Sequence, residues 1–192
     1  VTLDSIHIDH GNLKTDFSFD RGFERVLEDS VFNYDIFTVY PALEPGDSIR
    51  FDFEISNAPN EWLRNNSPVL GNGTFLNNSI LPRIGYNPAG ELIGSESREK
   101  FDLAPRDRMP DATDSLARMN NYISYDADWI DFETIISTDS DQIAIAPGYL
   151  EREWLDSGRR YFHYKMDSPI LNFYSFISAE FSTAQDYWLR TN

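Results

Sequence analysis

The chain has 192 residues, of which 41% are hydrophobic and 25% are charged, so it is long enough to build a globular core. Its formal net charge is −16, and a field of that sign repels phosphate backbones and anionic lipids, which excludes nucleic acid as an expected partner. The lack of cysteine excludes disulfides and thiolate zinc sites, and no apolar stretch approaches the ~20 residues that span a bilayer.

Alternation of apolar and polar residues at period two is the dominant pattern along the chain, and it predicts β-strands. Aromatic residues, at 15%, suit the half-buried surface of a sheet. The strands predicted in chain order are 3–9, 13–19, 36–40, 48–56, 129–137, 142–146, 149–154, 159–166 and 173–181. Turns are predicted at Pro45-Gly46, Pro147-Gly148 and Asp156-Ser157-Gly158.

Helix is expected to be scarce. Thr113 is a candidate cap for a short helix over 114–121, and 21–28 is a candidate for another turn or two. The region 57–110 is rich in Asn, Gly and Pro, which predicts long loops and short strands within the same domain. In the strand 48–56, Phe51 and Phe53 are predicted to be buried.

The three histidines, His7, His10 and His163, are the first candidates for metal ligands. On a strand, residues three apart point to opposite faces, so His7 and His10 share a site only if a turn at Gly11 brings them together. His163 alternates with Tyr161 and is expected on the outer face of its strand. We therefore nominate no metal ligand.

Motifs for catalysis are absent from the sequence. It contains no His-Glu-x-x-His, no Gly-x-Ser-x-Gly and no phosphate-binding glycine-rich loop. Asp139-Ser140-Asp141 resembles the start of a calcium loop, but Ile143 stands where the loop needs an oxygen ligand. We therefore nominate no catalytic residue and no cofactor-binding residue.

The last third of the chain carries the most specific pattern. A strand leads into Ala146-Pro147-Gly148-Tyr149-Leu150, a hairpin strand follows, and a turn at Ser168-Pro169 leads into a final strand. This order resembles the end of the N-terminal saddle domain of M1-family (gluzincin) aminopeptidases. Segments 40–47 and 81–87 resemble more closely a bacterial subgroup fused to an ABC-2-type membrane permease, and the resemblance spans 36–181.

The resemblance implies a mainly β fold of curved, mostly antiparallel sheets, a β-sandwich, in a single domain over 1–192 that belongs to a larger bacterial membrane protein. In that family the zinc and the catalytic motifs follow the saddle domain, so this chain is expected to be non-catalytic and to hold no cofactor. The implied partner is the catalytic peptidase domain of the same polypeptide, with a zinc ion and a substrate cleft that this domain helps to shape.

A peptide substrate is a second implied partner, and residues 116–120 are the nearest candidates to line the cleft. The chain is expected to be a soluble domain that does not itself enter the membrane, on the extracytoplasmic side.

Two alternatives stay open at this stage. One is a free-standing β-sandwich module that binds glycan or peptide through exposed rings such as Trp62, Trp154 and Trp188. The other is a small hydrolase whose site follows no known motif. A His-Glu-x-x-His motif downstream in the parent gene would favour the peptidase module.

Overall fold

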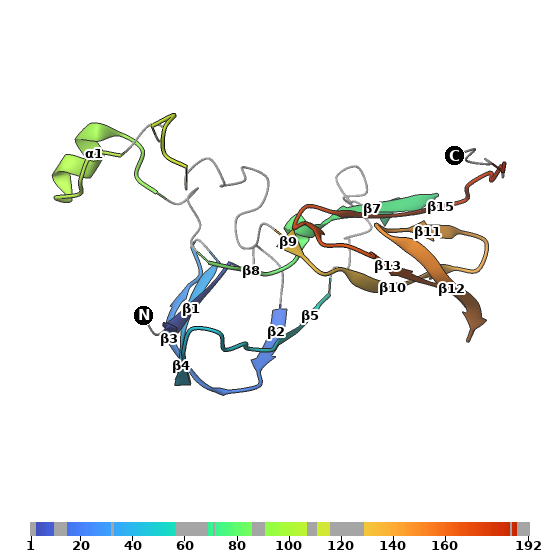
Figure 1. Ribbon diagram of the computed structural model, residues 1–192, viewed down its shortest axis with the longest axis horizontal. Coiled ribbons are helices and arrows are strands. Elements are labelled where there is room, and N and C mark those ends of the chain that lie inside the picture. Colours follow the sequence, from blue (N-terminus) through green and yellow to red (C-terminus); the bar gives the residue numbers. More distant parts are fainter. Residues whose placement is uncertain are drawn as a thin grey trace. The chain divides into compact units, whose positions relative to one another are not determined.

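A computed structural model describes residues 3–9, 15–31, 33–56, 69–70, 72–85, 91–106, 111–115, 129–184 and 186–187 (Figure 1). These residues are mainly β, and every strand pair with a defined register is antiparallel. Helix is limited here to α1 (Ser95–Lys100) and the 3-10 turn η2 (Asn78–Ile80). Within the described ranges no helix has the length and apolar character needed to cross a membrane.

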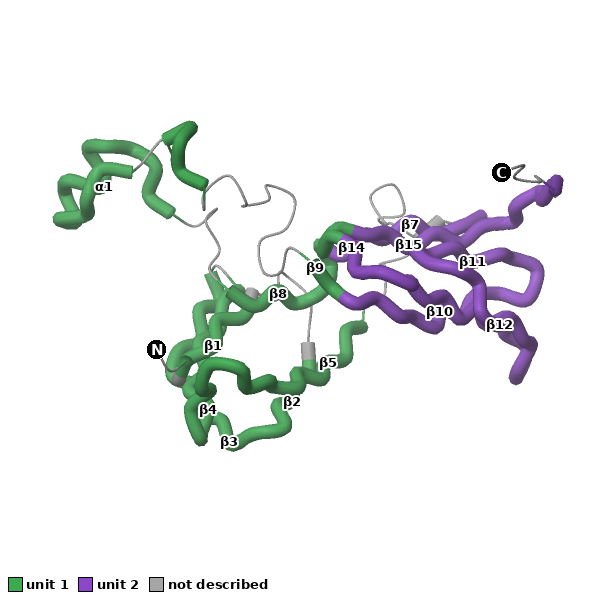
Figure 2. The backbone as a smooth tube through the Cα atoms, viewed as in Figure 1, with its two compact units in different colours: residues 1–58, 79–130, 171–173 green, residues 59–78, 131–170, 174–192 purple. Residues whose placement is uncertain are grey.

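The chain divides into two compact units, coloured separately in Figure 2. Unit 1 comprises residues 1–58, 79–130 and 171–173, and unit 2 comprises residues 59–78, 131–170 and 174–192. Each unit draws on segments that are distant in sequence. The single domain expected over 1–192 stays a prediction.

Unit 1 is built from a four-stranded sheet and a two-stranded sheet. The larger sheet has the order β3-β4-β1-β8, and the smaller sheet pairs β2 with β5. The bounds are β1 Leu3–Asp9, β2 Thr15–Phe19, β3 Gly22–Asp29, β4 Tyr34–Leu43, β5 Phe51–Ile55 and β8 Arg83–Ile84.

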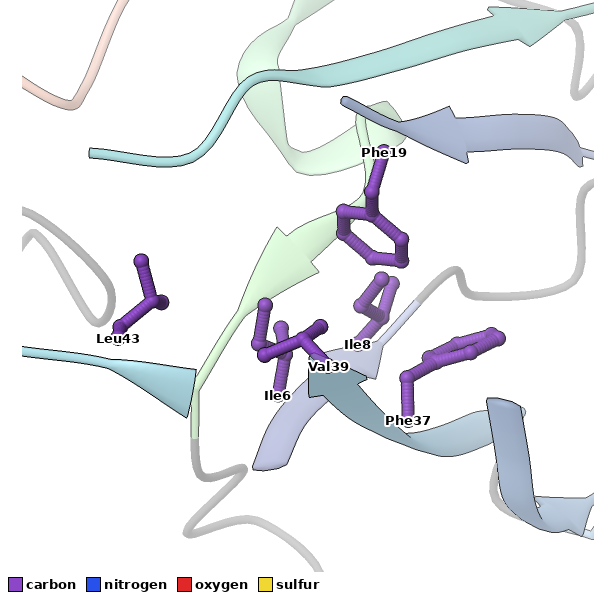
Figure 3. Close-up of a cluster of buried hydrophobic side chains, with 6 residues drawn as sticks. All are labelled: Ile6, Ile8, Phe19, Phe37, Val39 and Leu43. Atoms are coloured by element: carbon purple, nitrogen blue, oxygen red, sulfur yellow. The ribbon is translucent and has the colours of Figure 1, made fainter. Parts of the chain in front are cut away.

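The core of unit 1 forms where the two sheets face each other. Its buried side chains come from β1, β2 and β4: Ile6, Ile8, Phe19, Phe37, Val39 and Leu43 (Figure 3). Three half-buried residues, Phe17, Ile49 and Phe51, pack against this cluster. The Phe19 ring of β2 contacts the Phe37 ring of β4 edge-on with centroids 5.6 Å apart, which joins the layers.

Unit 2 is a sandwich of a four-stranded and a three-stranded sheet, with orders β11-β15-β7-β6 and β10-β13-β12. The bounds are β6 Val69–Leu70, β7 Gly73–Asn77, β10 Glu133–Asp139, β11 Ile143–Ile145, β12 Tyr149–Asp156, β13 Arg159–Lys165 and β15 Ser175–Ala179. Outside these two sheets, β9 (Trp129–Ile130), which belongs to unit 1, pairs with β14 (Ile170–Leu171).

Inward-facing side chains hold the layers of unit 2 together. Phe162 and Tyr164 on β13 are buried, and the Tyr164 hydroxyl donates a hydrogen bond of 2.9 Å to the carbonyl of Ala144 on β11. Burial raises the pKa of the Tyr164 phenol. Phe132 contacts the ring of Phe176 at a centroid distance of 6.3 Å.

Each strand predicted from alternation overlaps a strand of the structure, and one of the predicted strands is divided into two. The predicted strand 129–137 is two strands, β9 and β10, which are separated at Asp131 and Phe132. Phe132 is buried there, and its carbonyl accepts a hydrogen bond from the Met166 amide. The turns at Gly46, Gly148 and Gly158 are confirmed by their positive φ angles of 95°, 107° and 81°.

Two expectations are wrong. Residues 22–28 belong to strand β3 rather than to helical turns, because this segment pairs with β4. Phe51 is half-buried and Phe53 is 40% exposed, since the core cluster extends to Phe51 but not to Phe53. The short helix predicted over 114–121 lies outside the described residues except for Asp114 and Ser115, which are not helical.

Candidate functional site

A cleft of about 430 Å³ opens between the two sheets of unit 2. It is the default candidate for a binding site, because ligand pockets are concave and of this size. The cleft is lined by β7, β10, β15, the turn after β10 and the start of β13: Thr74, Leu76, Ile136, Ser137, Thr138, Asp139, Gln142, Arg159, Phe176, Ile177 and Ser178.

The cleft combines an apolar wall with a polar rim. Leu76, Ile136 and Phe176 supply apolar surface. The buried Thr138 hydroxyl donates a hydrogen bond of 2.9 Å to the amide oxygen of Gln142. Such a pair offers fixed polar atoms to a ligand without leaving a buried group unsatisfied.

Arg159 closes one end of the rim. Its guanidinium donates to the Ser137 carbonyl at 2.8 Å and to the Ser137 hydroxyl at 3.1 Å. It lies 3.9 Å from the Asp139 carboxylate, and both side chains are largely exposed. This exposed ion pair adds little stability, so its groups can exchange partners with a ligand at low cost.

A second feature is an apolar stripe on the outside of the β11-β15-β7 sheet. Ile145 pairs with Ile177, and Ile177 pairs with Phe75, so the three side chains are aligned across three strands. Their exposed fractions are 43%, 37% and 55%. We call these three residues the outer apolar face.

A third feature is the outside of the β10-β13-β12 sheet. The Trp154 ring stacks on Tyr161 with centroids 5.2 Å apart and planes at 11°. The Arg152 guanidinium lies 4.8 Å from the centre of the same Trp154 ring. The indole of Trp154 is therefore already in contact with Tyr161 on one strand and Arg152 on its own strand, and the three side chains form one stacked group.

The same surface carries a small charged cluster. The Glu133 carboxylate lies 2.7 Å from the His163 Nε2 atom and 3.3 Å from the Lys165 ammonium. The hydrogen bond from His163, and next the one from Lys165, lower the pKa of Glu133. The outward position predicted for His163 is confirmed, since its neighbours Phe162 and Tyr164 are buried on the other face.

The remaining sequence candidates do not assemble into a site. His7 is half-buried on β1 and contacts the ring of Tyr34 edge-on at 5.5 Å. His10, Trp62, Trp188 and residues 116–120 lie outside the described residues. Within the described ranges no group of three or more His, Asp or Glu side chains is placed to hold a metal ion.

The cleft residues were missed in the sequence, although a signal for them exists. Thr74, Leu76, Phe176 and Ser178 line the cleft at alternate positions of their strands, although Ile177, between the last two, also borders it. What the sequence lacks is the pairing of β7 with β15, which are separated by about a hundred residues and close together only in the fold.

No protein-family model matches the chain, and no curated protein or solved structure matches it either. The resemblance to the M1 saddle domain therefore rests on the sequence motifs and stays a prediction.

Proposed function

We propose that the chain is a non-catalytic β module that packs against a neighbouring catalytic domain through its outer apolar face. The observation that carries this proposal is the alignment of Phe75, Ile177 and Ile145 on the outside of a sheet, each at least one-third exposed. Contiguous exposed apolar surface marks interaction sites in soluble proteins. An antiparallel sheet normally presents polar residues on its solvent side.

The sequence motifs suggest what the neighbour is. They support an M1-like zinc aminopeptidase domain of the same polypeptide, in a bacterial protein that also carries an ABC-2-type permease. In this proposal the catalytic domain supplies the zinc and the chemistry, and the module shapes the substrate cleft. The mainly antiparallel β architecture supports this proposal only at the level of fold class.

The proposal is tested first in the parent gene. A His-Glu-x-x-His motif on a predicted helix within about a hundred residues after Asn192 is expected, because two histidines one helical turn apart bind zinc. A downstream sequence without any zinc-binding motif contradicts the M1-like identity.

A second test measures docking directly. The downstream segment, produced separately, is expected to bind the chain, and Ile177→Lys is expected to weaken binding by about tenfold or more because it places a charge in an apolar contact. Leu155→Lys is the matched control, since Leu155 is 69% exposed on β12, away from the outer apolar face. Equal loss in both variants, or no binding by the parent chain, contradicts docking through this face.

A further inference from the structure

We propose that the cleft of unit 2 binds a small aliphatic carboxylate, with its hydrocarbon chain between the two sheets and its carboxylate on Arg159. Three features of the cleft point to this ligand: its volume of about 430 Å³, its half-buried apolar lining, and Arg159 as the one cation among the described residues that line it. The proposed site goes beyond docking through the outer apolar face and does not depend on it.

The apolar side chains of the cleft face inward but are not fully covered. Ile136 on β10 pairs with Phe162 on β13, so the two side chains share the inner face of their sheet. Phe162 is 1% exposed, whereas Ile136 is half-buried, as are Leu76 and Phe176 from the opposite sheet. The cleft therefore leaves apolar surface between the sheets, and a hydrocarbon chain would cover it.

Arg159 is the group to which the ligand's charge is assigned. Its Nε and Nη2 atoms donate to the Ser137 hydroxyl and carbonyl, and these two hydrogen bonds hold the guanidinium beside β10. The Nη1 atom lies 3.9 Å from the Asp139 carboxylate, which is farther than a hydrogen bond. This contact leaves the Nη1 donors for a ligand carboxylate, and little side-chain entropy is lost because the arginine is already anchored.

Asp139 is a weak competitor for Arg159. The Asp139 side chain is 75% exposed and the Arg159 side chain 47% exposed, so their long contact adds little stability. A ligand carboxylate within hydrogen-bond distance of Nη1 would replace Asp139, which would turn to the solvent. The net charge of −16 acts weakly at this point, because charges beyond about 8 Å are screened at physiological salt.

The other polar residues of the cleft carry no charge. Thr138 and Gln142 are buried, and the Thr138 hydroxyl already donates to the Gln142 amide oxygen. Thr74 and Ser178 contribute neutral hydroxyls from the opposite sheet. Arg159 therefore determines the sign of the ligand's charge, and the ligand class is an acid with a chain of about eight carbons, which a pocket of this size accommodates.

The test compares three ligands on the 192-residue chain by calorimetry. Octanoate is expected to bind saturably. Octanol keeps the chain without the charge, and butanoate keeps the charge with a shorter chain, so each is expected to bind about tenfold more weakly or worse. The methyl NMR signals of Leu76 and Ile136 are expected to shift with octanoate, whereas that of Ile145 on the outer apolar face is not.

Matched variants locate the carboxylate. Arg159→Gln is expected to weaken octanoate binding by about tenfold and to leave octanol binding unchanged. Arg152→Gln removes the same charge from the outside of the same sheet and is expected to change neither. Asp139→Asn removes the competing carboxylate and is expected to strengthen octanoate binding by about threefold.

Two controls separate binding from folding. Amide hydrogen exchange in β13 checks that each variant keeps the sandwich of unit 2. Ser178→Leu fills the cleft from β15 without altering Arg159, and it is expected to weaken octanoate and octanol binding alike.

Four results overturn the proposal. They are the absence of saturable octanoate binding, equal binding of octanol and octanoate, equal weakening by Arg159→Gln and Arg152→Gln, and methyl shifts at Ile145 instead of Leu76 and Ile136. Octanoate binding that is unchanged or weaker in Asp139→Asn contradicts the exchange of partners on which the proposal depends. Because the outer apolar face is unaltered in every variant, a failure here leaves the docking proposal untouched.

Discussion

Gly148 occupies a position that a residue with a side chain cannot take without moving the backbone. Its φ of 107° is unfavourable for other residues, and a Cβ atom there would lie 2.7 Å from the Lys165 carbonyl. Gly46 has a similar φ of 95° but nothing within 4 Å of its Cβ direction. A substitution at Gly46 therefore tests backbone strain alone, whereas a substitution at Gly148 tests backbone strain together with steric overlap.

Replacing each glycine by valine is expected to give unequal losses. Gly46→Val should cost about 1–2 kcal/mol, the usual cost of an unfavourable backbone region. Gly148→Val should cost about 3 kcal/mol or more, because β12 and β13 must also move apart. Urea unfolding measures both free energies, and equal losses would contradict the steric argument.

The two phenylalanines Phe37 and Phe53 provide a second comparison. Phe37 is 1% exposed within the core of unit 1, and Phe53 is 40% exposed at the margin. Phe37→Ala is expected to lower the unfolding free energy by about 3–5 kcal/mol, and Phe53→Ala by about 1 kcal/mol. A larger loss at Phe53 would place it inside the core, where the alternation of the sequence had predicted it.

Alternation predicted which face Phe53 occupies but not how far the core extends along it. Phe53 pairs with Phe17 on the same sheet whose Phe51 packs on the cluster. Period two fixes the side of a strand, whereas burial depends on what covers that side. The covering strands come from distant parts of the sequence, so the limit of the core was not predictable.

Glu133 gives the chain a dependence on acid pH. Hydrogen bonds from His163 and Lys165 lower its pKa in the folded state, so the unfolded chain binds a proton more readily. The stabilisation is therefore present above the ordinary glutamate pKa and is lost as the pH falls through the lowered value. In an NMR titration, His163→Ala is expected to raise the pKa of Glu133, while Arg152→Ala, the control, should not change it.

The turn of the β12–β13 hairpin carries a residue that does not favour its backbone conformation, so a substitution there can stabilise the chain. Ser157 and Gly158 both have positive φ, 51° and 81°, which is the pattern of a type I′ turn. Asparagine tolerates the first of these positions better than serine does. Ser157→Asn is therefore expected to stabilise the chain by about 0.5 kcal/mol, measured by urea unfolding.

Ser140→Asn is the control for that change, because Ser140 lies in the turn after β10 and its φ is not positive. A gain at Ser140 equal to that at Ser157 would show a general effect of asparagine rather than an effect of the turn.

Turn residues made this hairpin predictable, whereas β3 was predicted as helix. Its sequence, Gly22–Asp29, lacks strict alternation because a register shift between Arg25 and Leu27 interrupts the period. An interrupted strand loses the pattern that distinguishes it from a short helix. α1 was missed for a different reason, since none of its six residues is buried and it carries no apolar stripe.

At the scale of the whole molecule, the described residues contain two cores that share no side chain. The core of unit 1 is the cluster around Phe37, and that of unit 2 includes Phe162, Tyr164 and Ala144. Composition and length are compatible with one domain or with two small ones, and the expectation of a single domain over 1–192 came from the resemblance. The distinction depends on whether the cores open together.

We expect the two cores to open separately, because each is closed by its own pair of sheets. Phe162→Ala should reduce amide protection in β13 and β15 by an amount equivalent to about 3 kcal/mol and leave β1 and β4 unchanged. Phe37→Ala should do the reverse, which makes each variant the control for the other. Native-state hydrogen exchange measures both. If either variant lowers protection equally in all four strands, the chain opens as the single cooperative domain that its sequence predicts, and the division into two units has no thermodynamic counterpart.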